Sequence, residues 1–380
     1  GYSSDALLKD LSSAGSITPR NSYHRQYNYQ SAFGRVNYNL SQKYILNLTF
    51  RRDGSSRFGP NRQFGNFGAI GGAWLFSGEN FISQGLPFLS YGKLRASYGT
   101  TGNDQIGDYQ YLDSWSPTSF PYGGVTGLSP TSIYNPDYSW EINKKFEAAL
   151  ELGFLKDRIL LTANYYNNRS SNQLVGYTLS PQSGFSSYIA NFPAKVENSG
   201  WEMEVNSSNI NSPKFKWNTT ANLTIPKNKL LEYPGLESSA DAASYALGQS
   251  IRVVKGFHFT GVDPQTGVPQ FLDVDKDGSI SDPEDYVVIG ETMPSFFGGL
   301  SNELHYSDWS LNFFFQFVKQ EAPTMDYGPL VNPYGTMSNS DVSVLKRWTK
   351  QGDVTSVPRA TANSSNAANS AFRNYYRYSD

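Results

Sequence analysis

The strongest constraint on the fold is a two-residue alternation of apolar and polar side chains, which recurs in about ten separate segments. Residues 201–206 are typical, with apolar side chains at odd positions and polar side chains at even ones. Successive side chains of a strand point to opposite faces, so each segment predicts a β-strand with one apolar face. The predicted strands lie in residues 27–40, 44–51, 66–76, 93–98, 145–153, 161–166, 201–206, 217–225, 300–306 and 309–318.

The connections between these segments alternate in length. The short ones lie around Gln42, Asp157, Ser212 and Asp308, and the long ones cover residues 53–63, 101–139, 173–197, 231–294 and 319 onward. Residues 77–90 are a longer exception on the short side, where a turn of helix is expected at 79–84. Short turns at one end and long loops at the other are typical of an all-β, antiparallel, up-and-down transmembrane β-barrel.

In such a barrel the apolar parity faces lipid and the polar parity faces the lumen. Aromatic residues near strand ends would then lie at the membrane interface, and the candidates are Tyr44, Trp201, Trp217 and Trp309. A soluble antiparallel sandwich shows the same alternation. Loops of about 20 to 60 residues are uncommon in a compact soluble domain, however, which favours the barrel.

The amino-acid composition further limits the classes of protein to which this chain can belong. Aromatic residues make up 15% of the chain although hydrophobic residues reach only 38%, a mixture that suits exposed strands with aromatic girdles. The net charge of −2 provides no basic field for nucleic acid, and the absence of cysteine excludes disulfides and thiolate metal sites. No apolar run reaches the roughly 18 residues of a spanning helix. Residues 1–10 do not read as a signal peptide, so we expect an internal piece of a longer exported protein rather than an intracellular one.

Residues 273–284 read DVDKDGSISDPE and match a calcium-loop pattern without a gap. Gly278 falls where the sharp turn of such a loop needs a positive φ. The flanking residues 268–272 and 286–289 are β-like rather than helical, so we predict a structural Ca²⁺ clamp on a β framework; the alternative is an acidic surface turn. The expected ligands are the carboxylates of Asp273, Asp275, Asp277 and Glu284, the backbone carbonyl of Ser279, and Ser281, which would bind through its hydroxyl or hold a water.

Evidence for an enzyme is weak. The histidines His24, His258 and His305 are scattered and form no spacing typical of a metal or catalytic site. Glu202 and Glu204 could imitate a catalytic carboxylate pair, but on one strand face they are better explained as lining a water-filled lumen. We therefore expect no enzymatic activity.

Substrate contacts are expected from the long loops and the lumen. The aromatic residues Trp115, Phe120 and Tyr122 are candidates for stacking on a sugar ring, and anchoring a loop core is the alternative role. The charged residues of 51–57 are expected to form an ion-pair network at a strand-to-loop turn rather than to contact a ligand.

Several stretches resemble one family, the SusC/RagA-like TonB-dependent outer-membrane transporters of the Bacteroidetes. They occur in the order of that family and span residues 50–317. They are FRRDGSSRFG at 50–59, FGNF at 64–67, GAW at 72–74 with ENF at 79–81, LRASYGTTGND at 94–104, WE at 140–141, KKFEAALE at 144–151, DR at 157–158, YYN at 165–167, VENSGWE at 196–202, and the calcium-type loop followed by FGGL at 297–300.

The resemblance implies TonB-dependent import of a nutrient, an oligosaccharide or a peptide, across the outer membrane. It implies a SusD-like surface lipoprotein as partner, contact with outer-membrane lipid, and coupling to the TonB complex through an N-terminal plug region. Members have barrels of about 22 strands, so residues 1–380 are expected to be a partial barrel domain that lacks the plug and the last strands. Residues 231–294 would be a long extracellular loop that carries the calcium-type loop at 273–284. A non-transporting calcium-binding surface barrel or adhesin module is the alternative function.

Overall fold

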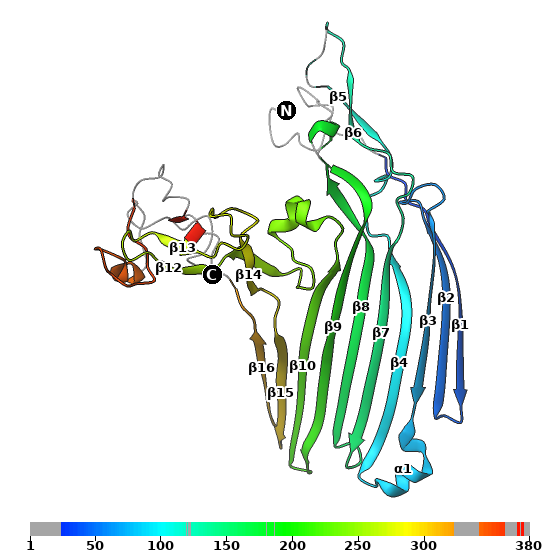
Figure 1. Ribbon diagram of the computed structural model, residues 1–380. Helices are drawn as coiled ribbons and strands as arrows, with labels where there is room; N and C mark the ends of the chain where they lie inside the picture. Colours follow the sequence, from blue (N-terminus) through cyan, green and yellow to red (C-terminus); the bar gives the residue numbers. More distant parts are fainter. Residues whose placement is uncertain are drawn as a thin grey trace, which may run out of the picture.

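The computed structural model describes residues 24–118, 120, 123–179, 181–185, 187–322, 342–361, 371–372 and 374–375. A ten-stranded sheet dominates it, with the order β1-β2-β3-β4-β7-β8-β9-β10-β15-β16 (Figure 1). Its strands are β1 (Tyr29–Leu40), β2 (Tyr44–Ser55), β3 (Phe64–Trp74), β4 (Leu89–Asn103), β7 (Glu141–Phe154), β8 (Ile159–Thr178), β9 (Ser187–Asn211), β10 (Phe215–Glu232), β15 (Phe296–Tyr306) and β16 (Trp309–Lys319). Each predicted alternating segment overlaps one of these strands, so the predicted all-β class is confirmed.

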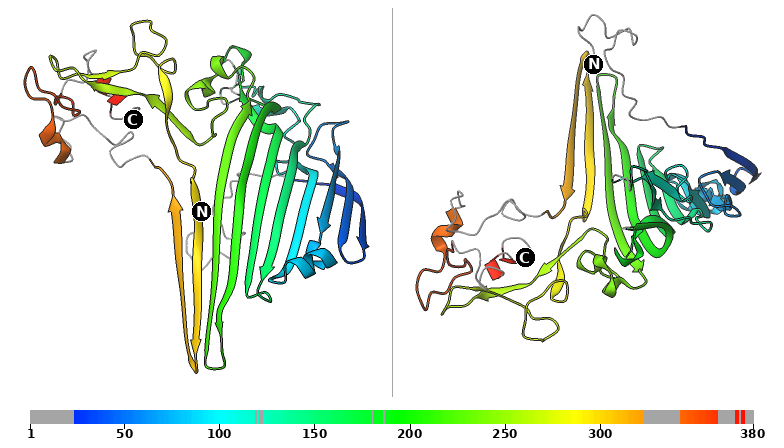
Figure 2. Two further views of the ribbon diagram at one scale, coloured as in Figure 1. Left: turned by 60° about the horizontal axis from the view of Figure 1, so that its bottom comes forward. Right: turned by 90° about the horizontal axis from the view of Figure 1, so that it is seen from above.

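Every neighbouring pair in the sheet is antiparallel, as expected for an up-and-down barrel. Among the described residues β1 and β16 pair on one side only, so the sheet is an open arc of a barrel (Figure 2). The tight turns are closed by residues with positive φ, including Ser41, Lys156 and Ser307. The longer connection between β3 and β4 holds α1 (Asn80–Gly85), which confirms the helical turn predicted there.

The long connections lie at the opposite end of the sheet, which we call the rim. One carries the hairpin β5 (Ser114–Pro117) and β6 (Leu128–Ser132). Another carries two further pairs, β11 with β14 and β12 with β13, which project away from the sheet (Figure 1). These strands are β11 (Val253–Phe257), β12 (Phe259–Val262), β13 (Pro269–Phe271) and β14 (Tyr286–Glu291).

The remaining elements are short stretches of 3-10 helix. They are η3 (Phe76–Gly78), η4 (Pro181–Ser183), η5 (Leu236–Ser238), η6 (Ala240–Ala243) and η7 (Val342–Lys346). None of the helices in the described part of the chain has the length and apolar content needed to cross a membrane.

The strand register places the apolar parity of all ten strands on one face. Directly opposite positions form a row that crosses the whole sheet and contains only apolar or aromatic residues and one glycine. The row is Leu40, Tyr44, Trp74, Leu94, Leu150, Ala163, Met203, Leu223, Gly298 and Phe317. A continuous apolar face of this kind must be covered, and in a membrane barrel lipid covers it. We call this face outward.

The opposite, inward face carries charged and amide side chains in the middle of the sheet. Glu151 accepts hydrogen bonds from Lys93 and Arg95, at 3.3 Å and 2.9 Å. On the next strands, the amide of Asn164 donates to the carboxylate of Glu202 at 3.2 Å. These contacts are those of a polar lumen wall, the role predicted for Glu202.

Candidate functional sites at the rim

A small aromatic core, which we call the rim core, ties the rim connections to the inner side of the sheet. It consists of the buried side chains Phe58, Phe67, Tyr138 and Trp140. The ring of Phe58 lies 4.8 Å from that of Trp140 and 6.0 Å from that of Tyr138. The indole of Trp140 donates to the carbonyl of Gln63 at 2.9 Å, and burial raises the pKa of Tyr138 to about 12. The motifs around residues 50–59 and 140–141, far apart in the sequence, therefore meet in one core.

Ion pairs surround this core. The guanidinium of Arg57 donates to the carboxylate of Asp108 and to the carbonyl of Asp104, both at 2.9 Å, and lies 4.1 Å from the ring centre of Tyr27. Asp108, followed by the charge of Asp104, raises the pKa of Arg57, because both favour its protonated form. Arg51 pairs with Asp53 at 2.6 Å. The predicted network is present only in part: Arg51 and Arg57 form separate ion pairs, whereas Arg52 donates to the side-chain oxygen of Asn66 at 3.0 Å and forms no ion pair with a described residue.

Backbone contacts also hold the motif at residues 50–59 in place. The amide of Gly59 donates to the carbonyl of Tyr138 at 3.0 Å. A Cβ atom added at Gly59 would lie 2.0 Å from the carbonyl oxygen of Pro136, so the two chain segments approach more closely than any side chain would allow. The motif is explained by this packing without a ligand.

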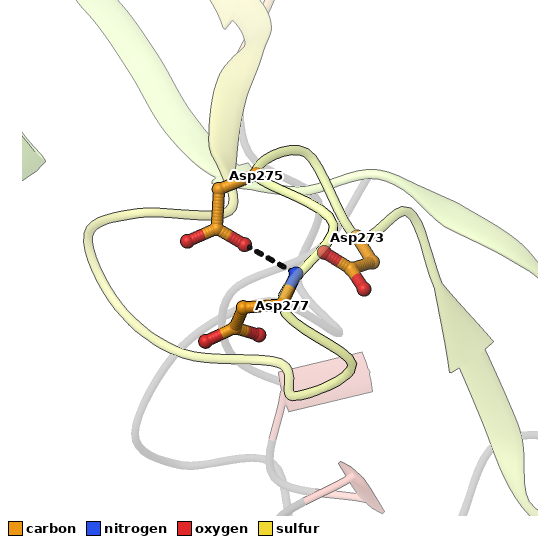
Figure 3. A group of neighbouring side chains, drawn as sticks. All are labelled: Asp273, Asp275 and Asp277. Atoms are coloured by element: carbon orange, nitrogen blue, oxygen red, sulfur yellow. Dashed lines mark hydrogen bonds between the residues drawn. The ribbon is translucent and has the colours of Figure 1, made fainter.

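The acidic loop at 273–284 connects β13 to β14, so its flanks are strands, as predicted. Gly278 has a φ of +85°, which confirms the positive φ expected at that position. The carboxylates of Asp273, Asp275 and Asp277 lie with one oxygen each within 4.8 Å of one another (Figure 3). Two oxygens on one Ca²⁺ with bonds of about 2.3–2.6 Å can be at most about 5 Å apart, so this spacing fits the ion.

Backbone N–H groups hold these three carboxylates in place. Asp273 accepts from Lys276 at 2.6 Å and from Gly278 at 2.9 Å, and Asp275 accepts from Asp277 at 3.2 Å (Figure 3). That N–H bond lowers the pKa of Asp275, but burial and the nearby carboxylates of Asp277 and Asp285 outweigh it and raise its pKa. A cation would relieve this crowding of negative charge.

The remaining predicted ligands are placed differently. Glu284 is exposed and does not join the three-carboxylate group. Its neighbour Asp285 is fully buried and accepts from the N–H of Val274 at 2.6 Å and of Ser281 at 2.9 Å, which closes the loop. Ser279 donates its N–H to Asp277 at 2.7 Å. Sequence reasoning missed Asp285, because the pattern ends one residue earlier.

The predicted sugar-stacking residues are not gathered in a site. Trp115 lies on β5 with 55% of its surface exposed, and its indole donates to Asp113 at 2.9 Å. Phe120 is 90% exposed at the tip of the same hairpin, and Tyr122 lies outside the described residues. Their role in stacking stays a prediction.

The sequence reading did not single out a hollow of about 520 Å³ at the rim, beside β9 and β10. Its lining includes Phe192, Tyr233, Asp241, Tyr245 and Leu230. The rings of Phe192 and Tyr233 lie 4.6 Å apart, and the hydroxyl of Tyr233 donates to the carboxylate of Asp241. The only signal in the sequence was the placement of two tyrosines and an aspartate in one long loop.

Comparison with known proteins agrees with this architecture. The family described as "TonB dependent receptor-like, beta-barrel" matches residues 1–378. TonB-dependent receptor P3 of Formosa agariphila is 32% identical over 91% of this chain, and SusC of Bacteroides thetaiotaomicron is 25% identical over 74%. The RagAB peptide importer in its closed-closed state superposes with a TM-score of 0.79 and 25% identity over 95% of this chain. The chain spans 37%, 30% and 41% of the lengths of these three proteins.

An antiparallel sheet with one continuous apolar face, tight turns at one end and long connections at the other defines a β-barrel of the outer membrane. The chain belongs to the TonB-dependent receptor β-barrel family, with SusC and RagA-type proteins among its relatives.

Proposed function

We propose that this chain forms barrel wall, lumen and rim of a transporter that imports a nutrient, an oligosaccharide or a peptide, by a TonB-dependent route. The outward apolar row that crosses all ten strands carries this proposal, because it commits the sheet to lipid while the inward face stays polar. The RagAB relative, a peptide importer, supports import as the activity. The rim hollow, with its aromatic rings and the carboxylate of Asp241, is a suitable place for contacts to a polar ligand.

The test is uptake by cells that carry the intact transporter. We expect labelled oligosaccharide or peptide to enter in a TonB-dependent manner, and a SusD-like surface lipoprotein to copurify with the barrel. Parallel assays with both substrate classes, in cells with and without TonB, separate glycan from peptide import. Binding of ligand without TonB-dependent entry would contradict the proposal and favour a non-transporting surface module.

We further propose that the acidic loop holds a structural Ca²⁺ through Asp273, Asp275 and Asp277, with Ser279, Ser281 and Glu284 as the further ligands of the sequence pattern. The mutual spacing of the three carboxylates supports this, as does the buried Asp285 that closes the loop from within. The ion would make the connection between β10 and β15 rigid and so support docking of the lipoprotein.

Replacing Asp275 and Asp277 together with alanine is expected to abolish Ca²⁺ binding, because two of the three clustered carboxylates are removed. The loop should become protease-sensitive, and the affinity for the lipoprotein should fall. Calorimetric titration with Ca²⁺, limited proteolysis and titration with the lipoprotein measure these three effects in the intact transporter. Asp282→Ala is the comparison: Asp282 is exposed on the same loop and is not one of the proposed ligands, so we expect little loss. Unchanged protease resistance and lipoprotein affinity in the double variant would rule out the structural role.

A further inference from the structure

The outward face carries a row of charged residues on the rim side of its apolar band. Lys144 on β7, Arg169 on β8, Glu197 on β9 and Lys229 on β10 lie directly opposite one another in consecutive strands. They point to the same face as the apolar row. Each lies an even number of residues from the member of that row on its own strand, and no register shift intervenes. The row thus places three cations and one carboxylate on the side of the sheet that meets lipid.

Part of this charge is neutralised within the row. Arg169 pairs with Glu197 at 2.7 Å. No ion pair with a described residue is formed by Lys144, by Lys229 or by Lys227, which lies two residues nearer the apolar band on β10. All three lysines are exposed. The row and Lys227 together hold four cations and one carboxylate, which leaves a net charge of +3 on one patch that we call the outward lysine patch.

The inward neighbours of these lysines confirm the direction in which the patch faces. Asn228 lies between Lys227 and Lys229 and is buried, with its amide donating to Asn198 at 2.7 Å. Leu230, the next residue, is also buried and lines the rim hollow. Alternation along β10 therefore sends the lysines outward and their neighbours inward.

The height of the patch above the apolar band matches a lipid headgroup layer. Tyr165 and Trp201 face each other on the outward side with their rings 5.2 Å apart, as in an interfacial girdle. Glu197 lies four residues beyond Trp201, about 13 Å along the strand. For a strand tilt of about 40° this is about 10 Å above the girdle, and lysine side chains can bend back toward the headgroups.

We propose that the outward lysine patch binds the phosphate groups of an anionic lipid in the outer leaflet that surrounds the barrel. Lysine ammonium groups donate hydrogen bonds to phosphate oxygens and attract them as point charges. Adjacent strands are about 4.8 Å apart, so the lysines on β7 and β10, three strand spacings apart, span about 14 Å and can contact more than one phosphate of the same headgroup. The site does not depend on which nutrient is carried.

The test uses the intact transporter in neutral detergent, titrated with lipid A that bears its phosphates and with the same lipid after enzymatic removal of the phosphates. We expect the phosphorylated lipid to bind at least tenfold more tightly, by native mass spectrometry, and to bind less tightly at high salt. The triple variant Lys144→Gln, Lys227→Gln, Lys229→Gln should bind it about a hundredfold more weakly, since each basic residue near a lipid surface contributes about fivefold.

Lys145→Gln is the matched control, because Lys145 is exposed and adjacent to Lys144 but lies on the inward face. It should bind the lipid like the unchanged protein. Equal affinity of unchanged protein for both lipids, an equal loss in Lys145→Gln, or displacement of the lipid by inorganic phosphate at similar concentration would each overturn the proposal. The comparison of the two lipids needs no variant, so it stands even if the triple variant does not assemble.

Discussion

Replacing Phe58 with alanine is expected to lower the stability of the rim core by about 3–5 kcal/mol, the usual cost of removing a buried phenylalanine side chain. Phe58 has no exposed surface and contacts both Trp140 and Tyr138. The amide of Gly59, bonded to the Tyr138 carbonyl, reports opening of this core. Hydrogen exchange of that amide in the intact transporter should become at least about a hundredfold faster.

Phe120→Ala is the control for this prediction. It removes the same side chain from the tip of the β5–β6 hairpin, where Phe120 is 90% exposed. Hydrogen exchange at Gly59 should not change in that variant. A loss of ligand affinity in Phe120→Ala would support the predicted stacking role of Phe120. A Phe58→Ala protein with unchanged exchange at Gly59 would show that the rim core does not hold these connections together.

Replacing Leu161 with arginine is expected to destabilise the barrel by about 2–4 kcal/mol, because a cation near the middle of the lipid-facing band must be taken out of water. Leu161 is on the outward face, four residues from Tyr165, and lies between Leu152 and Val205 of the neighbouring strands. The measurement is urea unfolding of the intact barrel refolded in lipid vesicles, followed by the mobility shift of the folded form on gels.

Asn164→Arg provides the matched comparison on the same strand. Asn164 faces inward beside Glu202, so an arginine there finds water and a carboxylate partner, and we expect little loss of stability. If the two variants were equally stable, the assignment of the outward and inward faces would be wrong.

Much of the sheet was predictable because each strand is encoded by a few consecutive residues. A period of two residues marks a half-buried strand wherever it occurs, and the tight turns at Ser41 and Ser307 fix the register of the hairpins they close. The positive φ of Gly278 was predictable for the same reason, since the turn geometry follows from a short stretch of sequence.

Other features required the tertiary structure, because they depend on which distant residues lie opposite one another. Phe58 and Trp140 form one core although they are far apart in the chain. Asp285, rather than Glu284, is buried in the acidic loop, because its carboxylate accepts hydrogen bonds from the N–H groups of Val274 and Ser281.

The sequence by itself determined the strands, their apolar parity and the acidic loop, since each is written in a few consecutive residues. Only the tertiary structure aligned Lys144, Arg169 and Lys229 in a single outward row. These residues are not regularly spaced in the sequence. They come together because the hydrogen-bond register between strands decides which residues of neighbouring strands lie opposite one another.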